Sequence, residues 1–270
     1  MQCILSAAEY PDANVIYDCL KASVHRNRVC LPAIAAADKV IFLESGNLRV
    51  FVEFLSRDEA FHVDELICAT DQAEIDHVSD PYERAKRVRF KNRRRRILSS
   101  VLDCAPDKLN FSYTNGKPSL TEFDGFHFST SYSGSAMALA CANSPVGVDL
   151  EEISNDSANE NVVETLFHHS EIDQLAGKSG MDWTRTFLAI WTQKEAFAKA
   201  LGSGFGIEFS DFAVAPLGGT INCDEMNTEN RPWYSKPLVV QNRHALAIAS
   251  NFPVPEIVIE EFSNLEGRNN

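Results

Sequence analysis

The stretch that decides the fold is Trp191-Thr192-Gln193-Lys194-Glu195-Ala196-Phe197-Ala198-Lys199-Ala200-Leu201-Gly202. It is typical of the second half of a helix that begins near Asp182 and ends at Gly202, because glycine readily adopts the left-handed conformation of a helix C-cap. Residues four apart lie on the same side of a helix, so one side presents Trp191, Glu195 and Lys199. Taken alone, this pattern fits a surface Glu–Lys pair beside a core tryptophan.

A second acidic cluster, Gly147-Val148-Asp149-Leu150-Glu151, favours a functional site instead. Alternate residues of a β-strand project from the same face, so Asp149 and Glu151 would lie side by side while Val148 and Leu150 face the core. Two carboxylates this close repel one another unless a cation lies between them, as in oxygen-ligated Mg²⁺ sites. The alternative is an acidic strand end at the surface. Glu195 would add a third carboxylate.

Basic residues are concentrated in one segment of an acidic chain. The formal net charge is −13 at pH 7, yet nine of the thirteen residues from Arg84 to Arg96 are lysine or arginine. Ser79 or Asp80 as N-cap and Pro81 in the first turn predict a helix that carries this segment and ends near Asp103. Three interpretations are open: a site for nucleic acid, a site for a compact phosphate-rich ligand, and a solvated helix face.

Composition excludes several classes of protein. A hydrophobic content of 44% with 10% aromatic residues is ordinary for a globular protein. No apolar run approaches the roughly 20 residues needed to span a bilayer, and the N-terminus lacks the basic start of a secretory signal. The seven cysteines are scattered without a Cys-x-x-Cys pair, so neither a zinc site nor a disulfide framework is indicated. A reducing cytoplasm fits best.

The remaining pattern predicts short strands on tight turns. Residues 39–44 and 48–55 predict a hairpin, and 109–113 a further strand. Strands at 126–131, 136–141 and 146–151 predict an antiparallel meander. A helical segment after residue 161 is interrupted near His168, with His169 or Ser170 as the new cap. Four short strands are expected near the C-terminus, at 212–214, 237–240, 245–249 and 257–261.

Four motifs, in this order, resemble the Sfp-type 4′-phosphopantetheinyl transferases, which activate carrier proteins. They are Gly116-Lys117-Pro118, Phe128-Ser129-Thr130-Ser131-Tyr132-Ser133, Gly147-Val148-Asp149-Leu150-Glu151 and Trp191-x-x-Lys194-Glu195-Ala196-x-x-Lys199-x-x-Gly202. The run from Glu83 to Phe90 and the arginine-rich segment after it are also similar to the family's N-terminal lobe. The resemblance covers roughly residues 80–250.

The resemblance implies an α/β (α+β) fold of two similar lobes, each a small, largely antiparallel sheet packed with a long helix. The lobes are expected at residues 1–125 and 126–270. The implied activity is transfer of the 4′-phosphopantetheine group from coenzyme A to a serine hydroxyl of an apo acyl or peptidyl carrier protein, with Mg²⁺, releasing 3′,5′-ADP. The alternative is a non-catalytic descendant that binds coenzyme A or a carrier protein. A cytoplasmic monomer is expected, with neither nucleic acid nor membrane as partner.

The resemblance also implies roles for residues of the C-terminal half. Asp149, Glu151 and Glu195 would ligate Mg²⁺ in the cleft between the lobes. Glu195 would also accept the proton of the carrier serine. Lys199 would contact the pyrophosphate of coenzyme A and stabilise the leaving 3′,5′-ADP, and Ser131 would help to hold the nucleotide.

Further implied contacts to coenzyme A come from the basic segment and the glycine turn. Lys117 would join Ser131 at the nucleotide, and Lys86 with either Arg95 or Arg96 would bind the 3′-phosphate.

Tyr132 stands where the family usually has the histidine of a Ser-His-Ser motif, so it is expected at coenzyme A as well. A neutral phenol can donate one hydrogen bond to a phosphate but supplies no positive charge. We therefore expect weaker coenzyme A binding, or a substitute cation such as Arg94.

Overall fold

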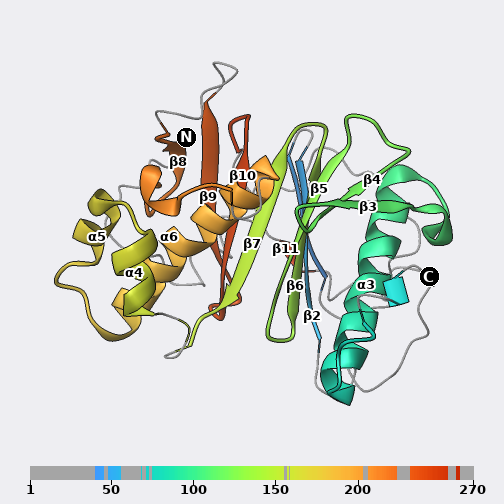
Figure 1. Cartoon of the computed structure of the whole chain (residues 1–270), viewed down its shortest axis with the longest axis horizontal. Helices are drawn as coiled ribbons and strands as arrows, with labels where there is room; N and C mark the ends of the chain where they lie inside the picture. The colour runs from blue at the N-terminus through green and yellow to red at the C-terminus, as the bar shows by residue number, and fades with distance from the viewer. Residues whose placement is uncertain are drawn as a thin grey trace, which may run out of the picture. The chain divides into compact units, whose positions relative to one another are not determined.

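The computed structural model describes residues 40–45, 48–55, 68, 71–72, 75–154, 157, 159–202, 206–223, 232–254 and 260–261. Small antiparallel sheets and two long helices make up this part of the chain (Figure 1). The predicted fold class, a mixed fold of small antiparallel sheets packed with long helices, is confirmed. Among the helices described, none combines the length and the apolar character that crossing a membrane requires.

The first sheet has five antiparallel strands. Their order is β11 (Glu260–Glu261), β1 (Val40–Ser45), β2 (Leu48–Phe54), β6 (Ala136–Ala142) and β5 (His127–Ser133). Strands β1 and β2 confirm the predicted hairpin at 39–55. Residues 257–259 of the last predicted strand lie outside the described residues. The sheet gives the N-terminal half of the site its rigid base.

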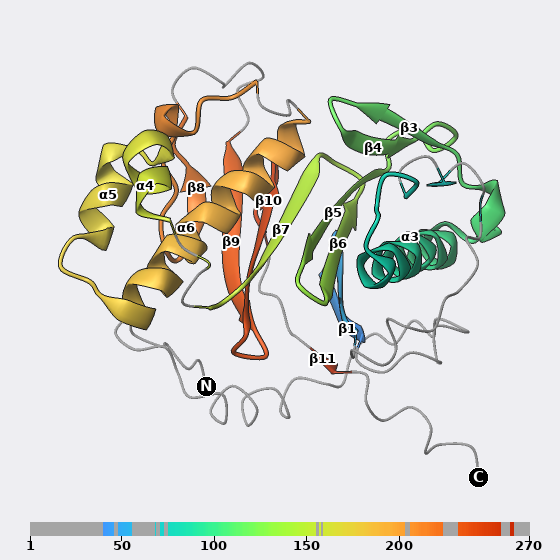
Figure 2. The same ribbon diagram turned by 60° about the horizontal axis from the view of Figure 1, so that its bottom comes forward.

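Helix α3 (Pro81–Leu102) covers one face of this sheet, and a hairpin of β3 (Phe111–Thr114) and β4 (Lys117–Leu120) lies beside it (Figure 2). Asp80 caps α3, as predicted, by accepting a hydrogen bond of 2.8 Å from the backbone N–H of Glu83. Phe51 of β2 and alternate residues of β6 pack in one cluster with apolar side chains of α3 such as Ile97 and Leu98. The basic segment is therefore held on the first sheet.

The second sheet has four antiparallel strands. Their order is β7 (Val146–Glu152), β10 (His244–Ser250), β9 (Trp233–Val240) and β8 (Gly219–Ile221). Strands β9 and β10 agree with the predictions at 237–240 and 245–249. Strand β8 was not predicted, and residues 212–214 contribute only an isolated bridge between Ala213 and Asn222.

Helices α4 (Glu160–Leu166), α5 (His169–Leu175) and α6 (Gly180–Leu201) cover the outer face of the second sheet (Figure 2). Helix α6 ends at Gly202, whose φ of 69° confirms the predicted left-handed cap. The cap of α5 differs from the prediction. His168, and neither His169 nor Ser170, caps this helix, because its side chain and that of Glu171 form a reciprocal capping box.

The predicted meander over residues 126–151 is wrong in its third strand. Strands β5 and β6 pair in the first sheet, but β7 pairs with β10 in the second. The reason is that β6 already has a partner on each edge, β2 and β5, so β7 cannot add to it. Residues Val146, Val148 and Leu150 of β7 face the first sheet instead, within an apolar layer between the two sheets. The sheets thus divide between β6 and β7, and the lobes at 1–125 and 126–270 stay a prediction.

Gly147 allows α6 to lie directly against β7. A Cβ atom at this position would lie 1.9 Å from the carbonyl oxygen of Ala196 and 2.5 Å from the backbone nitrogen of Ala200. The backbone of the helix therefore contacts the backbone of the strand. This contact places α6 over the face of β7 from which Asp149 projects.

We predict that Gly147→Ala displaces α6 and lowers the free energy of unfolding by about 1–3 kcal/mol, as expected for overpacking. Urea denaturation followed by circular dichroism would measure the change. An unchanged urea midpoint would show that α6 can shift without cost.

Candidate functional site

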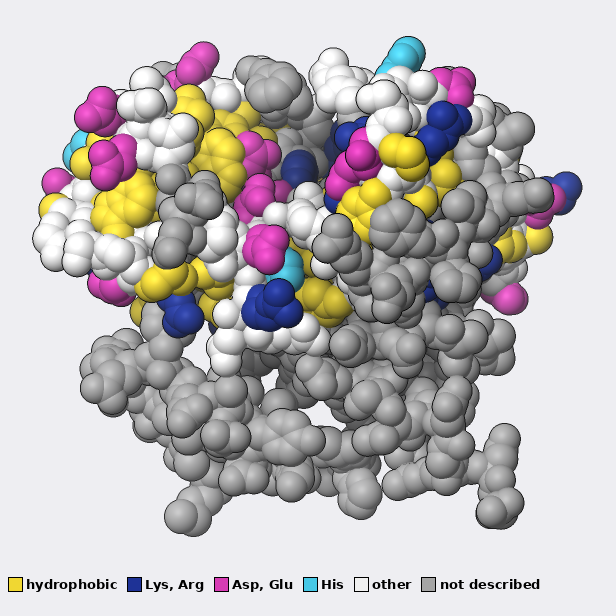
Figure 3. Space-filling model, turned by 90° about the horizontal axis from the view of Figure 1, so that it is seen from below, with side chains coloured by type: hydrophobic (Ala, Val, Ile, Leu, Met, Phe, Trp, Pro, Cys, Tyr) yellow, Lys and Arg dark blue, Asp and Glu magenta, His cyan; other side chains and the backbone are white. Residues whose placement is uncertain are grey.

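A cavity of about 820 Å³ lies between the two sheets' outer elements, where α3, the β3–β4 hairpin and β5 meet α4, α6 and residues 207–209. Its volume is in the range of small-molecule pockets, roughly 300–1,000 Å³. In the space-filling view, acidic and basic side chains both gather at the hollow between the two halves (Figure 3). Five of the predicted site residues line this cavity: Lys86, Lys117, Tyr132, Glu195 and Lys199.

Asp149 lies at the centre of a hydrogen-bonded cluster beside the cavity. Its Oδ1 atom accepts hydrogen bonds from Ser131 Oγ at 2.8 Å and from Lys199 Nζ at 2.6 Å. Lys199 also donates to Ser131 Oγ at 3.0 Å. The carboxylate is 2% exposed, and its Oδ2 atom is buried without a hydrogen-bond partner in the described part of the chain. The structure thus brings together residues from three of the sequence motifs.

The negative charge of Asp149 affects the pKa of two further carboxyl groups, those of Glu195 and Glu151. Burial raises the pKa of Glu195, and the negative charge of Asp149 raises it further, while Lys199 lowers it. Burial and Asp149 raise the pKa of Glu151 in the same order, against a hydrogen bond of 2.9 Å from Ser133. Both shifts mean that burial and the charge of Asp149 together outweigh the opposing effect of Lys199.

The predicted metal ligands do not form a ready-made coordination site. Among the residues described, no group of three or more His, Cys, Asp or Glu side chains is arranged to hold a metal ion. The ammonium of Lys199 occupies one oxygen of Asp149. The assignment of Asp149, Glu151 and Glu195 to Mg²⁺ therefore stays a prediction.

Alternate serines of β5 connect the two sheets at the site. Ser129, Ser131 and Ser133 share one face of the strand. Ser129 Oγ accepts from the backbone N–H of Val148 at 3.1 Å, and Ser133 Oγ accepts from that of Glu152 at 2.9 Å. The serine-rich motif thus fixes β7 beside β5, and Ser131 is the member of the series that reaches Asp149.

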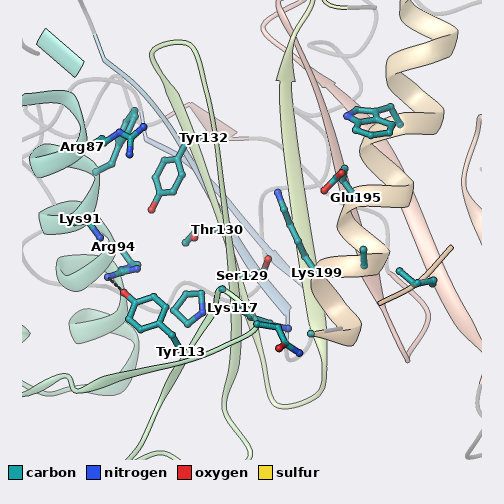
Figure 4. A pocket seen from close by; sticks show the side chains of 18 of the residues that line it. Arg87, Lys91, Arg94, Tyr113, Lys117, Ser129, Thr130, Tyr132, Glu195 and Lys199 are labelled. Atoms are coloured by element: carbon teal, nitrogen blue, oxygen red, sulfur yellow. Dashed lines mark hydrogen bonds between the residues drawn. The ribbon is translucent and has the colours of Figure 1, made fainter. Parts of the chain in front are cut away.

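Lys117 reaches across the cavity from the β3–β4 hairpin. Its Nζ atom donates a hydrogen bond of 3.2 Å to the carbonyl oxygen of Ala200 in the last turn of α6. Burial lowers the pKa of Lys117 to about 8. Figure 4 shows Lys117 and Lys199 on the same side of the pocket, near the end of α6.

The adjacent residues Lys194 and Glu195 have different surroundings. Lys194 is fully buried, forms an ion pair of 2.9 Å with Glu171, and donates to the carbonyl oxygens of Phe209 and Phe212 at 2.6 and 2.7 Å. Since every contact is internal, Lys194 anchors α6 to its neighbours. Only Glu195 of this pair faces the cavity.

Arg95 does not fit its predicted role at a phosphate. Its side chain is 0% exposed, with Nε 2.6 Å from Asp71 and Nη1 2.7 Å from the carbonyl oxygen of Leu109. Position 95 faces the protein interior, so the guanidinium stabilises the fold. Arg96 is exposed and lies outside the cavity wall. Part of the basic segment is therefore neutralised internally, as Arg93 also shows through its bidentate pair with Glu53 at 2.6 and 2.9 Å.

Sequence reasoning missed two basic residues of the cavity, Arg87 and Lys91, which lie on α3 beside Arg94. The spacing of 87, 91 and 94 places them on one helix face, and this signal was available in the sequence. Lys86 lines the cavity as predicted, but its Nζ atom is 2.7 Å from Glu83, which offsets part of its charge.

We predict that Glu195→Gln raises the melting temperature at pH 7. A carboxyl group whose folded pKa is raised destabilises the fold once it is ionised, and this cost disappears as pH falls below the unfolded pKa of about 4.3. The gain over the wild type should therefore shrink as pH approaches 4. Thermal denaturation at both pH values measures it, with the exposed Glu164→Gln as control. An equal or lower melting temperature for Glu195→Gln at pH 7 would contradict the prediction.

Comparisons with known proteins agree with these motifs. Residues 145–249 match the model of the 4′-phosphopantetheinyl transferase superfamily. The chain is 34% identical to the 4′-phosphopantetheinyl transferase gsp of Aneurinibacillus migulanus, over 44% of this chain and 49% of that protein. It is 33% identical to 4′-phosphopantetheinyl transferase psf-1 of Bacillus pumilus, over 47% and 52% respectively.

A third relative, the 4′-phosphopantetheinyl transferase Sfp of Bacillus subtilis (strain 168), is 26% identical over 59% of this chain and 70% of that protein. The matched part spans about half the length of the first two relatives. Residues 145–249, which match the superfamily model, include β7 and α6 with Asp149, Glu151 and Glu195. The resemblance to the Sfp-type enzymes is therefore confirmed, and it is carried by residues 145–249, which are similar to the 4′-phosphopantetheinyl transferase superfamily.

Proposed function

We propose that this protein transfers the 4′-phosphopantetheine group of coenzyme A to a serine hydroxyl of an apo acyl or peptidyl carrier protein and releases 3′,5′-ADP. The observation that carries the proposal is the cluster of Ser131, Asp149 and Lys199 beside Glu195, at the edge of a cavity of about 820 Å³. The relatives named 4′-phosphopantetheinyl transferases support the same reaction class.

The charges around the cavity suit a ligand with phosphates at two places. Lys117 and Lys199 provide ammonium groups near the end of α6. Arg87, Lys91 and Arg94 provide positive charge on the opposite wall, along α3. Coenzyme A carries a pyrophosphate and a separate 3′-phosphate, so it complements both walls.

Mg²⁺ is the proposed cofactor, and Asp149, Glu151 and Glu195 would hold it. The residues fit a hard cation for two reasons. The Oδ2 atom of Asp149 is a buried acceptor without a partner in the described residues, and burial together with the negative charge of Asp149 raises the pKa of both glutamates. When bound there, the ion would offset negative charge on the pyrophosphate oxygens.

The residues of the chain would divide the work of phosphoryl transfer. The carrier serine Oγ forms a bond to the phosphorus that bears the pantetheine arm, while the bond from that phosphorus to the oxygen of the leaving 3′,5′-ADP breaks. Glu195 accepts the hydroxyl proton, and its raised pKa makes it a stronger base than an exposed glutamate. Lys199 stabilises the charge that develops on the leaving phosphate.

Mass spectrometry of apo carrier proteins tests the reaction directly. With coenzyme A and Mg²⁺, the wild type should add 4′-phosphopantetheine to the carrier serine, whereas Glu195→Gln should bind coenzyme A but transfer about 10²–10⁴-fold more slowly. Lys199→Met should also be slow. Lys178→Met is the matched control, since Lys178 pairs with Asp182 at the start of α6, outside the cavity.

The outcomes separate the alternatives. Absence of any mass gain across fatty-acid, polyketide and peptide carriers would reject the activity. Tight coenzyme A binding without product would favour a non-catalytic binding protein. Full turnover by Glu195→Gln would reject Glu195 as the base.

The lowered pKa of Lys117 predicts that the affinity for coenzyme A depends on pH. The ammonium form binds phosphate, and burial lowers the pKa of Lys117 to about 8. Affinity should therefore fall as pH rises through about 8, with proton uptake on binding near that pH. Calorimetry between pH 6.5 and 9.5 would measure the slope, which Lys117→Gln should flatten. The exposed Lys108→Gln is the control, and an unchanged slope in Lys117→Gln would contradict the prediction.

A further inference from the structure

His244 is a buried histidine whose ring has no hydrogen-bond partner in the described part of the chain. It is the first residue of β10 and is 4% exposed. Neither its Nδ1 nor its Nε2 atom forms a hydrogen bond there. Most buried polar atoms of proteins are paired, so this ring is an exception that calls for an explanation.

The ring lies in the apolar layer between the two sheets. Alternate residues of a strand share a face, so His244 projects on the same side of β10 as Leu246 and Ile248. Those two residues pack in one apolar cluster with Val50 of β2. The ring of Phe54, at the end of β2, lies 5.2 Å from that of His244 between centroids. His244 therefore closes one end of the junction at which the first sheet faces the second (Figure 1).

The surroundings of the ring favour its neutral form. Burial has the largest effect and lowers the pKa of His244, while the negative charge of Glu152 on β7 raises it and the preceding Arg243 lowers it. The residues that β6 and β9 contribute to the apolar layer carry no charge. From β2 the ring meets Phe54, because the carboxylate of Glu53 forms its ion pair with α3, on the other side of the sheet.

We propose that protonation of His244 in mild acid weakens the junction between the two sheets, so that the fold contains a pH-sensitive contact. The neutral ring fits among apolar side chains, whereas the imidazolium places a charge there without a hydrogen-bond partner. The two sheets carry opposite walls of the cavity, and His244 is not among the residues that line it. The contact therefore acts on the site from a distance, whatever reaction occurs there.

The direction of the pH effect follows from linkage. The unfolded chain binds the proton at an ordinary histidine pKa of about 6.5, above the lowered pKa of the folded state. This group should therefore leave the free energy of unfolding unchanged above about pH 6.5, and it should lower that free energy as pH falls from there to the folded pKa.

Thermal denaturation between pH 5 and pH 8 tests the proposal. The melting temperature of the wild type should fall in acid. His244→Leu keeps an apolar side chain at the junction and should reduce this fall by about 2–4 °C, the scale of a single-site effect in a protein of roughly this size. His77→Leu, at an exposed position, is the matched control and should keep the slope of the wild type.

Nuclear magnetic resonance of the wild type follows the ring itself and decides the matter even if His244→Leu does not fold. The imidazole signals of His244 should titrate below the ordinary histidine value of about 6.5, and the ring signals of Phe54 should shift with the same midpoint. An unaltered pH slope in a folded His244→Leu would overturn the proposal. So would a His244 midpoint at or above about 6.5, or Phe54 signals that do not follow the titration. None of these results bears on the transferase proposal.

Discussion

The rest of the structure depends on how the buried carboxylate of Asp149 is compensated. A carboxylate that is 2% exposed is tolerated only with hydrogen bonds and an opposite charge. Ser131, on β5 of the first sheet, donates a hydrogen bond to Asp149. Lys199, on the helix α6 that covers the second sheet, supplies the opposite charge. The group that organises the site therefore also ties the two sheets together, so fold and site share one constraint.

Helix α6 is held in place by contacts that do not involve Glu195. The negative charge of Glu195 can therefore remain incompletely compensated without loss of the helix. The contact at Gly147 sets its distance from β7, and the ion pair of Lys194 with Glu171 anchors its other side. These internal interactions stabilise the helix independently of Glu195. The fold can then keep Glu195 partly buried near Asp149, in an environment that raises its pKa, and this strain is typical of a functional carboxylate.

Local patterns predicted more than long-range ones. The caps Asp80 and Gly202 and the shared face of Asp149 and Glu151 follow from interactions within a few residues, and all could be predicted. The partner of β7 could not, because it depends on β6 already being paired on both edges. The structural role of Arg95 could not be predicted from the sequence either. Neighbouring residues of α3 point to the interior or to the cavity according to how the helix lies on its sheet, and that angle is set by tertiary packing.

The two sides of the cavity differ in how their charges are arranged, and this asymmetry is the reason to propose a metal at one end only. On the side of α6, Glu195 lines the cavity together with Lys199 and Lys117, and the negative charges of Asp149 and Glu151 act on it from beside the cavity. On the wall of α3, cations outnumber Glu83, the acidic residue there that lines the cavity. A polyphosphate can bind the second wall directly. On the side of α6 it would meet closely spaced carboxylates, and this is the physical reason for proposing a divalent cation there.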